Sequence, residues 1–488
     1  MNPDDRRPLY VQIADGISEQ IESGQFASGD RLPTMRALSA TLRVALITVA
    51  QAYELLVTQG RVVSRVGRGT FVAAKRAAPE AYLRGWEPDV GRFLQAERME
   101  GVLDELSRAH RAGVISLATG HPATETFPMV EFGKAMNRTL LDDSPEIMQY
   151  RANSGDPDLC EALASALRRR GAPIDAADII VSSGAQQAAD IVASTLLGTR
   201  ETVAVESPSY PGTLGVFDAR GATYVEITSD ESGVRIEDME RVFAEYRPRL
   251  FYLNSVSQNP TGRMLPERRG KQIVALARRY DVVILEDQTG WVFTYDGPAP
   301  PPLAAHDTDG RVIVMESLSK SIFPALRIGY LAAKGALRPP LQAAKLRADS
   351  FTSTLMQRAL WRFMTAPAYA RHLKNARTLY RNRRDTFIQA FSEFAPWLAP
   401  APPAAGTNVW LALPARISTR AAFDACAREG VLVMPAEPFY PTRRGPAALR
   451  LSFGDLSEAD AREGVARLAR ALAPLANRRE EGTAASHP

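Results

Sequence analysis

The sequence predicts an α/β protein in two parts: an N-terminal winged helix-turn-helix, and a larger domain built on a mostly parallel sheet with a smaller α+β subdomain at its C-terminal end. Three observations predict this fold class. Residues 1–76 have the pattern of three helices followed by a short β-ribbon. From residue 114 to about 395, short apolar β-branched segments alternate with helical ones, as in parallel strands covered by helices. A Pro-rich break at 396–405 then precedes mixed strands and helices.

Length and composition are those of an ordinary globular protein. The chain has 488 residues, of which 45% are hydrophobic and 23% charged, and at roughly 150 residues per domain it holds about three folding units. Its formal net charge of +4 is too small to imply nucleic-acid binding. Residues 1–76, however, hold ten Lys and Arg against seven Asp and Glu, so most of the excess positive charge lies in the N-terminal part.

The number of cysteines and the hydropathy of the sequence indicate the cellular compartment. Two cysteines, Cys160 and Cys426, are too few for a disulfide framework and indicate free thiols in a reducing environment. The N-terminus lacks the apolar stretch of a signal peptide, and no apolar run approaches the ~18 residues that a membrane span needs. We therefore expect a cytoplasmic protein with no membrane segment, and the sequence predicts no metal site.

The first part has the element order of a winged helix-turn-helix. We expect helices at 9–23, 34–41 and 45–59 and strands at 61–66 and 70–73, the strands being joined by a Gly-Arg-Gly turn. In such a domain a helix reads base edges in the major groove, and the hairpin brings backbone and guanidinium groups close to the phosphates. A small helical domain that binds protein has the same order of elements, and it remains an alternative at this point.

Three stretches of this part resemble the DNA-binding domain of the GntR family: PLYVQI (8–13), SGDRLPTMRAL (28–38) and RVGRGTFV (65–72). The resemblance implies binding to double-stranded DNA. It also departs from the family at one place, because the third helix usually begins Ser-Arg-x-Thr and here begins Ala45-Leu46-Ile47-Thr48. Leucine replaces an arginine that normally reaches DNA, which predicts an altered affinity or target sequence, or a lost DNA function. The residues that the resemblance places against DNA are Arg36, Thr48, Arg65, Arg68 and Thr70.

The second part reads as an open sheet with helices on both faces. We divide the remainder into a linker (77–112), a large domain (113–395), a small C-terminal subdomain (396–477) and a disordered tail (478–488). In a mostly parallel sheet, ligands bind outside the carboxyl ends of the strands. The expected strands of the large domain are 179–182, 203–206, 250–253, 282–286 and 312–315.

A lysine follows the last of these strands. Ser317 and Ser319 precede Lys320, and Arg327 follows seven residues later. A lysine among hydroxyls and near an arginine suits a phosphorylated carbonyl compound, because the amine forms an imine while the hydroxyls and the guanidinium bind the phosphate. A surface lysine after a strand is the plain alternative.

Other motifs also sit at expected strand ends or on strands. Residues 183–186 (SGAQ) open a helix, whose first N–H groups favour a phosphate. Asp287 ends an apolar strand, where a carboxylate needs a cation such as a pyridinium nitrogen. Arg450 lies on an apolar strand, where a substrate carboxylate would pair with it. Each motif also has a purely structural alternative. Residues 183–186 could be an ordinary turn, Asp287 a helix N-cap, and Arg450 a member of a structural salt bridge.

Taken in order, these motifs and the turn NPTG (259–262) resemble a fold-type-I aminotransferase dependent on pyridoxal phosphate (PLP), over roughly residues 115–475. The resemblance implies that Lys320 forms the Schiff base, Asp287 pairs with the ring nitrogen, and Arg450 binds the substrate carboxylate. The implied ring contacts are Asn259, to the ring hydroxyl, and Tyr210, stacked on the ring. The implied phosphate ligands are Ser183, Gly184, Ala185, Gln186, Ser317, Ser319 and Arg327, together with Tyr150 from the partner subunit of a dimer.

One expected residue of this family is missing. The family usually has a tyrosine two or three residues after the aspartate, bonded to the ring hydroxyl. Here the residues are Asp287-Gln288-Thr289-Gly290-Trp291, and Thr289 could substitute only partly. The loss predicts slowed or altered chemistry and leaves PLP binding possible.

The whole chain is similar to the MocR-type subgroup of GntR regulators. In that subgroup the second domain senses PLP, or PLP plus an amine, and the protein is a head-to-tail homodimer. The resemblance implies a transcriptional regulator in which a small amine or amino acid effector exchanges with the Lys320 aldimine and changes DNA binding. The alternative is a working aminotransferase with a degenerate DNA-binding domain, so whether the chain is an enzyme stays open. A domain used only for dimerisation is a third reading, which the retained lysine, aspartate and arginines disfavour.

Overall fold

In the computed structural model, the described residues are 8–22, 25–27, 29–58, 61–65, 69–72, 107, 113–143, 145–149, 154–198 and 200–477. They fall into two compact units, one within residues 1–91 and the other within 92–488, which are taken separately below. Tyr150, Arg68, the expected linker apart from residue 107, and the expected tail at 478–488 lie outside the described residues. The domain boundaries drawn from the sequence remain predictions.

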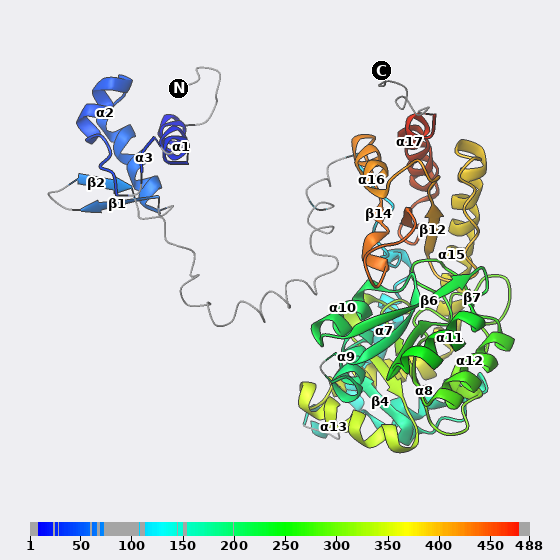
Figure 1. The fold of residues 1–488 in the computed structure, drawn as a ribbon. Helices are drawn as coiled ribbons and strands as arrows, with labels where there is room; N and C mark the ends of the chain where they lie inside the picture. The colour runs from blue at the N-terminus through cyan, green and yellow to red at the C-terminus, as the bar shows by residue number, and fades with distance from the viewer. Residues whose placement is uncertain are drawn as a thin grey trace, which may run out of the picture. The chain divides into compact units, whose positions relative to one another are not determined.

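The first unit is a winged helix-turn-helix (Figure 1). It consists of α1 (Leu9–Glu22), α2 (Met35–Leu42), α3 (Leu46–Thr58), β1 (Val62–Arg65) and β2 (Gly69–Val72), the two strands being antiparallel. Its core is formed by apolar residues at helical spacing from α1 and α3, sealed by the first and last residues of the ribbon. The fully or nearly fully buried members include Ile13, Ile17, Val49, Tyr53, Leu56, Val62 and Val72. The predicted order of elements is confirmed.

The segment before α2 pairs with one strand of this ribbon. Arg31 bridges Phe71 in antiparallel fashion, and the N–H of Leu32 donates to the carbonyl of Thr70 at 2.9 Å. The Thr34 hydroxyl then caps α2 by accepting the N–H of Ala37 at 3.2 Å. In this way the start of α2 is tied to the ribbon.

None of the single helices among the described residues is long and apolar enough to cross a membrane; α2 and α3 pass that test only when taken together, and the pair is bent by 120° at its break.

An eight-stranded sheet forms the centre of the second unit (Figure 1). Its strand order is β4-β11-β10-β9-β8-β5-β6-β7, and the five strands from β10 to β6 run parallel. β11 is antiparallel to both of its neighbours, and β7 is antiparallel to β6. The bounds are β4 (Ile179–Ser182), β5 (Thr202–Ser207), β6 (Thr223–Asp230), β7 (Gly233–Val234), β8 (Leu250–Asn254), β9 (Val283–Asp287), β10 (Val312–Ser317) and β11 (Gly329–Ala332).

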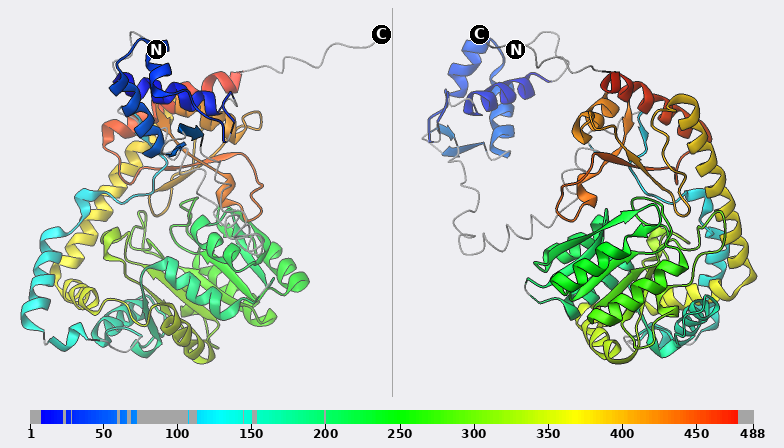
Figure 2. Two further views of the ribbon diagram at one scale, coloured as in Figure 1. Left: turned by 90° about the vertical axis from the view of Figure 1, so that its left-hand side faces the viewer. Right: turned by 45° about the vertical axis from the view of Figure 1, so that its right-hand side comes forward.

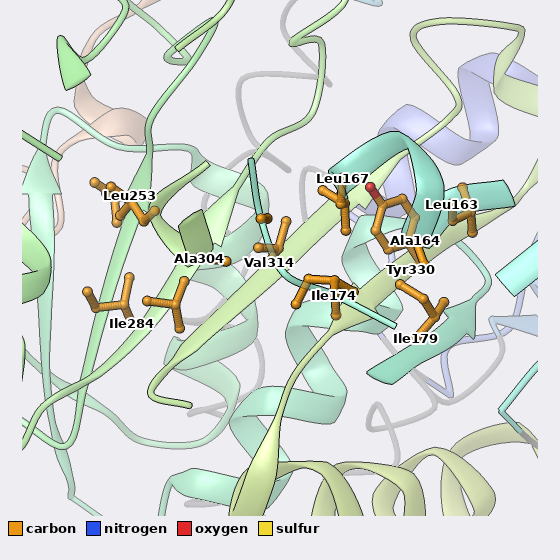
Figure 3. Packing of buried hydrophobic residues seen from close by; sticks show 14 of the residues in the cluster. Leu163, Ala164, Leu167, Ile174, Ile179, Leu253, Ile284, Ala304, Val314 and Tyr330 are labelled. Atoms are coloured by element: carbon orange, nitrogen blue, oxygen red, sulfur yellow. The ribbon is translucent and has the colours of Figure 1, made fainter. Parts of the chain in front are cut away.

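Helices cover both faces of this sheet, because successive strand residues point to opposite sides. Ile284 and Val314 pack with α7 (Met129–Asp142), α8 (Pro157–Arg169), α11 (Ile236–Tyr246), α12 (Glu267–Tyr280) and α14 (Thr354–Thr365), as Figure 3 shows in part. Their neighbours Leu285 and Ile313 pack on the other face with α9 (Ala185–Leu196), α10 (Pro211–Ala219) and α13 (Arg338–Asp349). The predicted fold class, a mostly parallel sheet between helices, is confirmed.

A long helix, α15 (Pro367–Phe394), leads from this sheet to the C-terminal subdomain, as both views of Figure 2 show. The subdomain has an antiparallel sheet in the order β12-β15-β14, covered by α16 (Thr419–Arg428) and α17 (Glu458–Asn477). Its strands are β12 (Asn408–Ala412), β14 (Met434–Pro435) and β15 (Ala448–Ser452). A separate parallel pair joins β3 (Ile115–Ser116) to β13 (Val431–Leu432).

Candidate functional site

The predicted motifs converge on one cavity of about 530 Å³ between the carboxyl ends of the sheet strands and the C-terminal subdomain. The convergence follows from the topology, since parallel strands end at the same edge of the sheet. Ser183 and Gly184 lie at its border, in contact with Arg327. The predicted residues that line the cavity itself are Ala185, Gln186, Tyr210, Asn259, Asp287, Ser317, Ser319, Lys320, Arg327 and Arg450.

Lys320 points into this cavity. Its Nζ donates a hydrogen bond to the carbonyl of Gly120 at 2.8 Å. The side chain is exposed to the open cavity, but protein walls surround it on most sides. These low-dielectric walls lower the pKa of the Lys320 ammonium, and the positive charge of Arg450 lowers it further. A lowered pKa makes the neutral, nucleophilic amine more available.

The turn after β4 forms one side of the cavity. Gly184 has φ +99°, a conformation that favours glycine, and α9 begins at the next residue. The Arg327 Nη2 donates to the carbonyl of Ser183 at 2.8 Å, which holds the guanidinium beside the first turn of α9. Gly329 lets the strands close up here, because a Cβ on it would lie 2.6 Å from the Glu316 carbonyl oxygen. The helix N-terminus, its free N–H groups and the guanidinium together suit a phosphate.

Ser317 and Ser319 continue this wall. The Ser317 hydroxyl accepts the N–H of Ser319 at 3.3 Å. The Ser319 Oγ is buried and has no hydrogen-bond partner among the described residues. A buried hydroxyl without a partner is costly in a protein alone, so it indicates a ligand that completes the site.

Asp287 lies at the end of β9, almost fully buried. Burial raises the pKa of its carboxyl, while hydrogen bonds from the N–H and hydroxyl of Thr289 and from Tyr252 lower it. The Thr289 N–H is 2.9 Å from Oδ1, and the Tyr252 hydroxyl is 3.2 Å from Oδ2. A buried carboxylate with donors on both oxygens is well placed to receive a further cation.

Asn254, at the end of β8, is a site residue that the sequence analysis missed. Its Nδ2 donates to the backbone carbonyl of Asp287 at 2.8 Å, and its Oδ1 accepts the N–H of Asn259 at 3.0 Å. One amide therefore joins the two residues predicted to hold a cofactor ring. The only hint in the sequence was a polar residue at the end of an apolar strand, as at Asp287.

Asn259 lies in the turn that Asn254 supports. Its Oδ1 is buried and lacks a hydrogen-bond partner among the described residues. Asn259 also lines the cavity, so a group bound there is a candidate partner for this side chain.

Thr289 stands where the aminotransferase pattern has tyrosine. Its Oγ1 accepts the N–H of Ser317 at 3.2 Å, and its hydroxyl also bonds to Asp287. The hydroxyl thus links the ends of β9 and β10 and does not reach across the cavity as a phenol would.

Arg450 lies on the central strand of the small sheet and is nearly fully buried. Burial lowers its pKa to about 10, an effect that the nearby Tyr210 opposes. Its Nη1 donates to Asn408 Oδ1 at 3.3 Å, and its Nε has no partner among the described residues. No carboxylate of the described residues is paired with it, so it is free to take one from a ligand.

In the first unit, the predicted DNA-facing residues differ in how far they are buried. Arg36 is exposed on the first turn of α2, and Thr48 is half-buried on the first turn of α3. Thr70 is buried, and its hydroxyl lies 3.2 Å from that of Ser64. The side chains of Arg65 and Arg68 lie outside the described residues.

One basic residue of the first unit escaped the sequence analysis. Arg31 lies over the ribbon, where a Cβ on Gly69 would come within 2.7 Å of its Nε. Only the folded bridge to Phe71 places this guanidinium beside the wing.

Two families match the two units. Residues 112–468 match aminotransferase class I and II, and residues 9–72 match bacterial regulatory proteins of the gntR family. The HTH-type transcriptional regulator TauR of Rhodobacter capsulatus is 31% identical over 492 residues, which cover 96% of this chain and 98% of TauR. Aromatic-amino-acid aminotransferase 1 of Thermococcus litoralis is 32% identical over 377 residues, 75% of this chain and 90% of that protein.

Solved structures resemble the second unit. The multiple substrate aminotransferase of Thermococcus profundus superposes with a TM-score of 0.74 at 30% identity, over 77% of this chain and 95% of that one. LysN, the α-aminoadipate aminotransferase of Thermus thermophilus, solved with N-(5'-phosphopyridoxyl)-L-leucine, has a TM-score of 0.73 at 28% identity, over 81% of this chain and 99% of that one.

Fold and matches together define a gntR-type DNA-binding domain joined to a fold-type-I aminotransferase domain. The protein belongs to the MocR-type subfamily of GntR regulators. The cofactor of its second domain is PLP. The residues fit this cofactor, because Ser319, Asn259 and Arg450 line the cavity beside the lysine and each has a buried polar atom without a partner among the described residues.

Proposed function

We propose that this protein is a transcriptional regulator whose second domain senses PLP together with an amino compound through the amine of Lys320. The observation that carries the proposal is a lysine of lowered pKa, in the same cavity as a buried arginine without a carboxylate partner among the described residues. The cavity belongs to a chain that also has a gntR-type domain. A DNA-binding regulator works where the chromosome lies, so we place it in the cytoplasm.

Each residue has a proposed part in sensing. Lys320 would hold PLP through its Nζ, with loss of one water from the amine and the aldehyde, and would become a free amine again when an effector amine takes its place. PLP, when bound, supplies this aldehyde and a ring that draws electrons. Asp287 holds the proton on the ring nitrogen, and Asn259 bonds the ring hydroxyl. Ser183, Gly184, Ala185, Gln186, Ser317, Ser319 and Arg327 are the proposed phosphate ligands, and Tyr210 the stacking residue.

Arg450 narrows the class of effector. A buried guanidinium with an unused Nε favours a carboxylate, so we propose an amino acid or another amine that carries one. Binding of this carboxylate would draw the small subdomain toward the sheet, since Arg450 is on β15 and Lys320 follows β10. That movement is the proposed signal to the DNA-binding unit.

A homodimer is part of the proposal. α7 exposes Met129, Val130, Leu140 and Leu141, an apolar group unusual for a free surface. We propose that a second copy covers it, arranged head-to-tail, and that Tyr150 of the partner subunit reaches the phosphate. The dimer would also present two copies of the proposed DNA contacts Arg36, Thr48, Arg65 and Arg68 to double-stranded DNA, while Thr70, which is buried in the ribbon, would support the wing.

The visible absorption of the purified protein with PLP tests the covalent bond. We expect a band that disappears in Lys320→Ala and shifts with one amine of a panel of amino acids. Lys334→Ala is the matched control, because Lys334 Nζ also donates to a backbone carbonyl, that of Pro173 at 2.7 Å, outside the cavity. A protein that stays colourless, with no borohydride-stable adduct at residue 320, would refute the sensing function.

Binding to the DNA upstream of its own and neighbouring genes tests the regulator. We expect binding in a mobility-shift assay, with an affinity that changes when PLP and the active amine are added. Absence of binding under all of these conditions would favour the second candidate.

That second candidate is a working aminotransferase with a degenerate DNA-binding domain. Two observations favour it: the similarity to Thermococcus litoralis aromatic-amino-acid aminotransferase 1, and the exposed Leu46 and Ile47 at the start of α3. Steady-state transamination between an amino acid and a keto acid separates the two. Turnover of about 1 s⁻¹ or more would favour the enzyme, and we expect slower turnover because Thr289 replaces the tyrosine.

A further inference from the structure

A second cavity, of about 770 Å³, lies outside the cofactor site and is rich in arginine. We call it the arginine cavity. Its walls come from the end of α8, the loop after β9 and the middle of α15. Four of its twelve lining residues are arginines, and none of the twelve is Asp or Glu. The charged and aromatic lining residues are Arg169, Arg170, Arg377, Arg381, Trp291 and Tyr295.

Arg170 is the one arginine of this cavity whose charge is balanced from within the protein. Its guanidinium stacks 4.1 Å from the Trp291 ring, and its Nη2 donates to Gln288 Oε1 at 2.7 Å. The carboxyl groups of Glu316 and Glu286 face it from the sheet. We therefore treat Arg170 as part of the wall.

The other three arginines are less fully balanced, although the Asp296 carboxyl, whose pKa is lowered chiefly by its hydrogen bond with Arg384, also interacts with the charge of Arg381. Arg377 uses its Nε to bond the carbonyl of Val292 at 2.9 Å, and Arg169 bonds the Ser165 hydroxyl at 2.8 Å. Neither these two nor Arg381 forms an ion pair with a described residue. The nearest carboxylate along the loop is Asp296, which Arg384 binds through both Nη atoms.

These three guanidinium groups line this cavity, and two of them, Arg169 and Arg381, are exposed, so together they make its surface attractive to anions. We propose that the arginine cavity binds a small anion with two or more negative charges, either a phosphate ester or a polycarboxylate. Guanidinium groups bind both kinds of oxyanion in bidentate fashion, so these groups define the class of ligand and leave its source open. Pro298 and Pro301 give the cavity an apolar rim for the remainder of such a ligand.

The arginine cavity shares two walls with the cofactor cavity. In the loop after β9, Phe293 lines the cofactor cavity, while Trp291 and Tyr295 line the arginine cavity. On α15, Tyr380 lines the first cavity, and the arginines three residues before it and one after it line the second. The rings of Phe293 and Tyr380 meet at 4.8 Å between centroids. An anion that draws in the arginines therefore acts on both of these rings, and its binding is coupled to that of PLP.

Calorimetric titration of the full chain, saturated with PLP, with pyrophosphate at constant ionic strength tests the site. Saturation with PLP keeps pyrophosphate out of the phosphate cradle. We expect a Kd below about 1 mM and binding about tenfold weaker in Arg381→Gln, which removes one charged donor without touching the Arg377 bond to the loop. The double variant Arg377→Gln/Arg381→Gln should lose more.

The matched control is Arg371→Gln/Lys374→Gln, which removes two exposed cations from α15 outside the cavity. Unchanged binding in this control supports the site. The proposed site would be overturned if pyrophosphate binds no more tightly than about 1 mM. It would also be overturned if Arg381→Gln and the control lose the same affinity, because that result would show only general attraction between charges. Pyrophosphate that binds without changing the affinity for PLP would overturn the coupling.

Discussion

Asn254→Ala tests whether one buried amide positions the cofactor site. The change removes the donor to the Asp287 carbonyl and the acceptor for the Asn259 N–H, at 2.8 and 3.0 Å. A buried polar group left without its partner costs about 1–3 kcal/mol. Asn254 lines the open cavity, so water can replace part of each bond. We take the lower end of the range for each group and expect a loss of about 2 kcal/mol in the free energy of unfolding.

The same substitution should weaken PLP binding. Asp287 and Asn259 are the residues proposed to hold the ring, and each loses a hydrogen bond to Asn254. A loss of about 1.4 kcal/mol in binding corresponds to about tenfold in Kd. Urea unfolding of the variant measures the first quantity, and titration with PLP followed by absorbance measures the second.

Asn375→Ala is the control, because it removes an amide from an exposed position of α15. Alanine favours the helix there, so its stability should be equal or slightly higher. If Asn254→Ala loses stability but binds PLP as tightly as the parent, Asn254 has no positioning role. If neither quantity changes, the hydrogen bonds of the folded structure contribute nothing, and the reasoning fails.

Three further predictions concern pH, close packing and DNA. Burial raises the pKa of Glu206 to about 8, above its ordinary 4.5, so between these pH values the folded state holds a proton that the unfolded state has lost. The free energy of unfolding should therefore fall as the pH rises from about 4.5 to about 8. Glu206→Gln should flatten this fall, as measured by urea unfolding at a series of pH values. Gly329→Ala places a Cβ 2.6 Å from the Glu316 carbonyl, and we expect a lower melting temperature and weaker PLP binding by absorbance, in contrast to Gly16→Ala, where nothing lies within 4 Å. If the exposed Arg36 contacts phosphate, as we propose, Arg36→Ala should weaken DNA binding to all sequences alike and reduce its salt dependence in a mobility-shift assay. A change in sequence preference alone would contradict this.

The sequence predicted the parts of the site that are local in the chain. Gly184, Asp287 and Lys320 each lie at or just after the end of a strand, so an apolar run with a polar end marked them as candidates, and the resemblance of the whole set of motifs to an aminotransferase implied their roles. Their convergence followed from a general rule of parallel sheets, and the structure places Asp287 and Lys320 in one cavity with Gly184 at its border.

The parts that the sequence analysis missed depend on contacts between distant segments. Arg31 reaches the wing through a bridge to Phe71, and β3 pairs with β13 more than 300 residues later. Gly120 accepts the hydrogen bond of Lys320 although 200 residues separate them. No local pattern of residues encodes such pairs, because each half is an ordinary segment until the fold places the other beside it.

Thr289 shows both limits at one residue. The absence of the tyrosine was visible in the sequence, but the hydrogen bonds that the threonine makes in its place were not. The threonine hydroxyl ties Asp287 to the N–H of Ser317, so it links the end of β9, with the proposed ring partner, to the end of β10, three residues before Lys320. A site that keeps its binding groups rigid while lacking the phenol that speeds exchange is better suited to holding a ligand than to rapid turnover. For this reason Thr289→Tyr should raise transamination by the chain, and an unchanged rate would count against assigning slow chemistry to this residue.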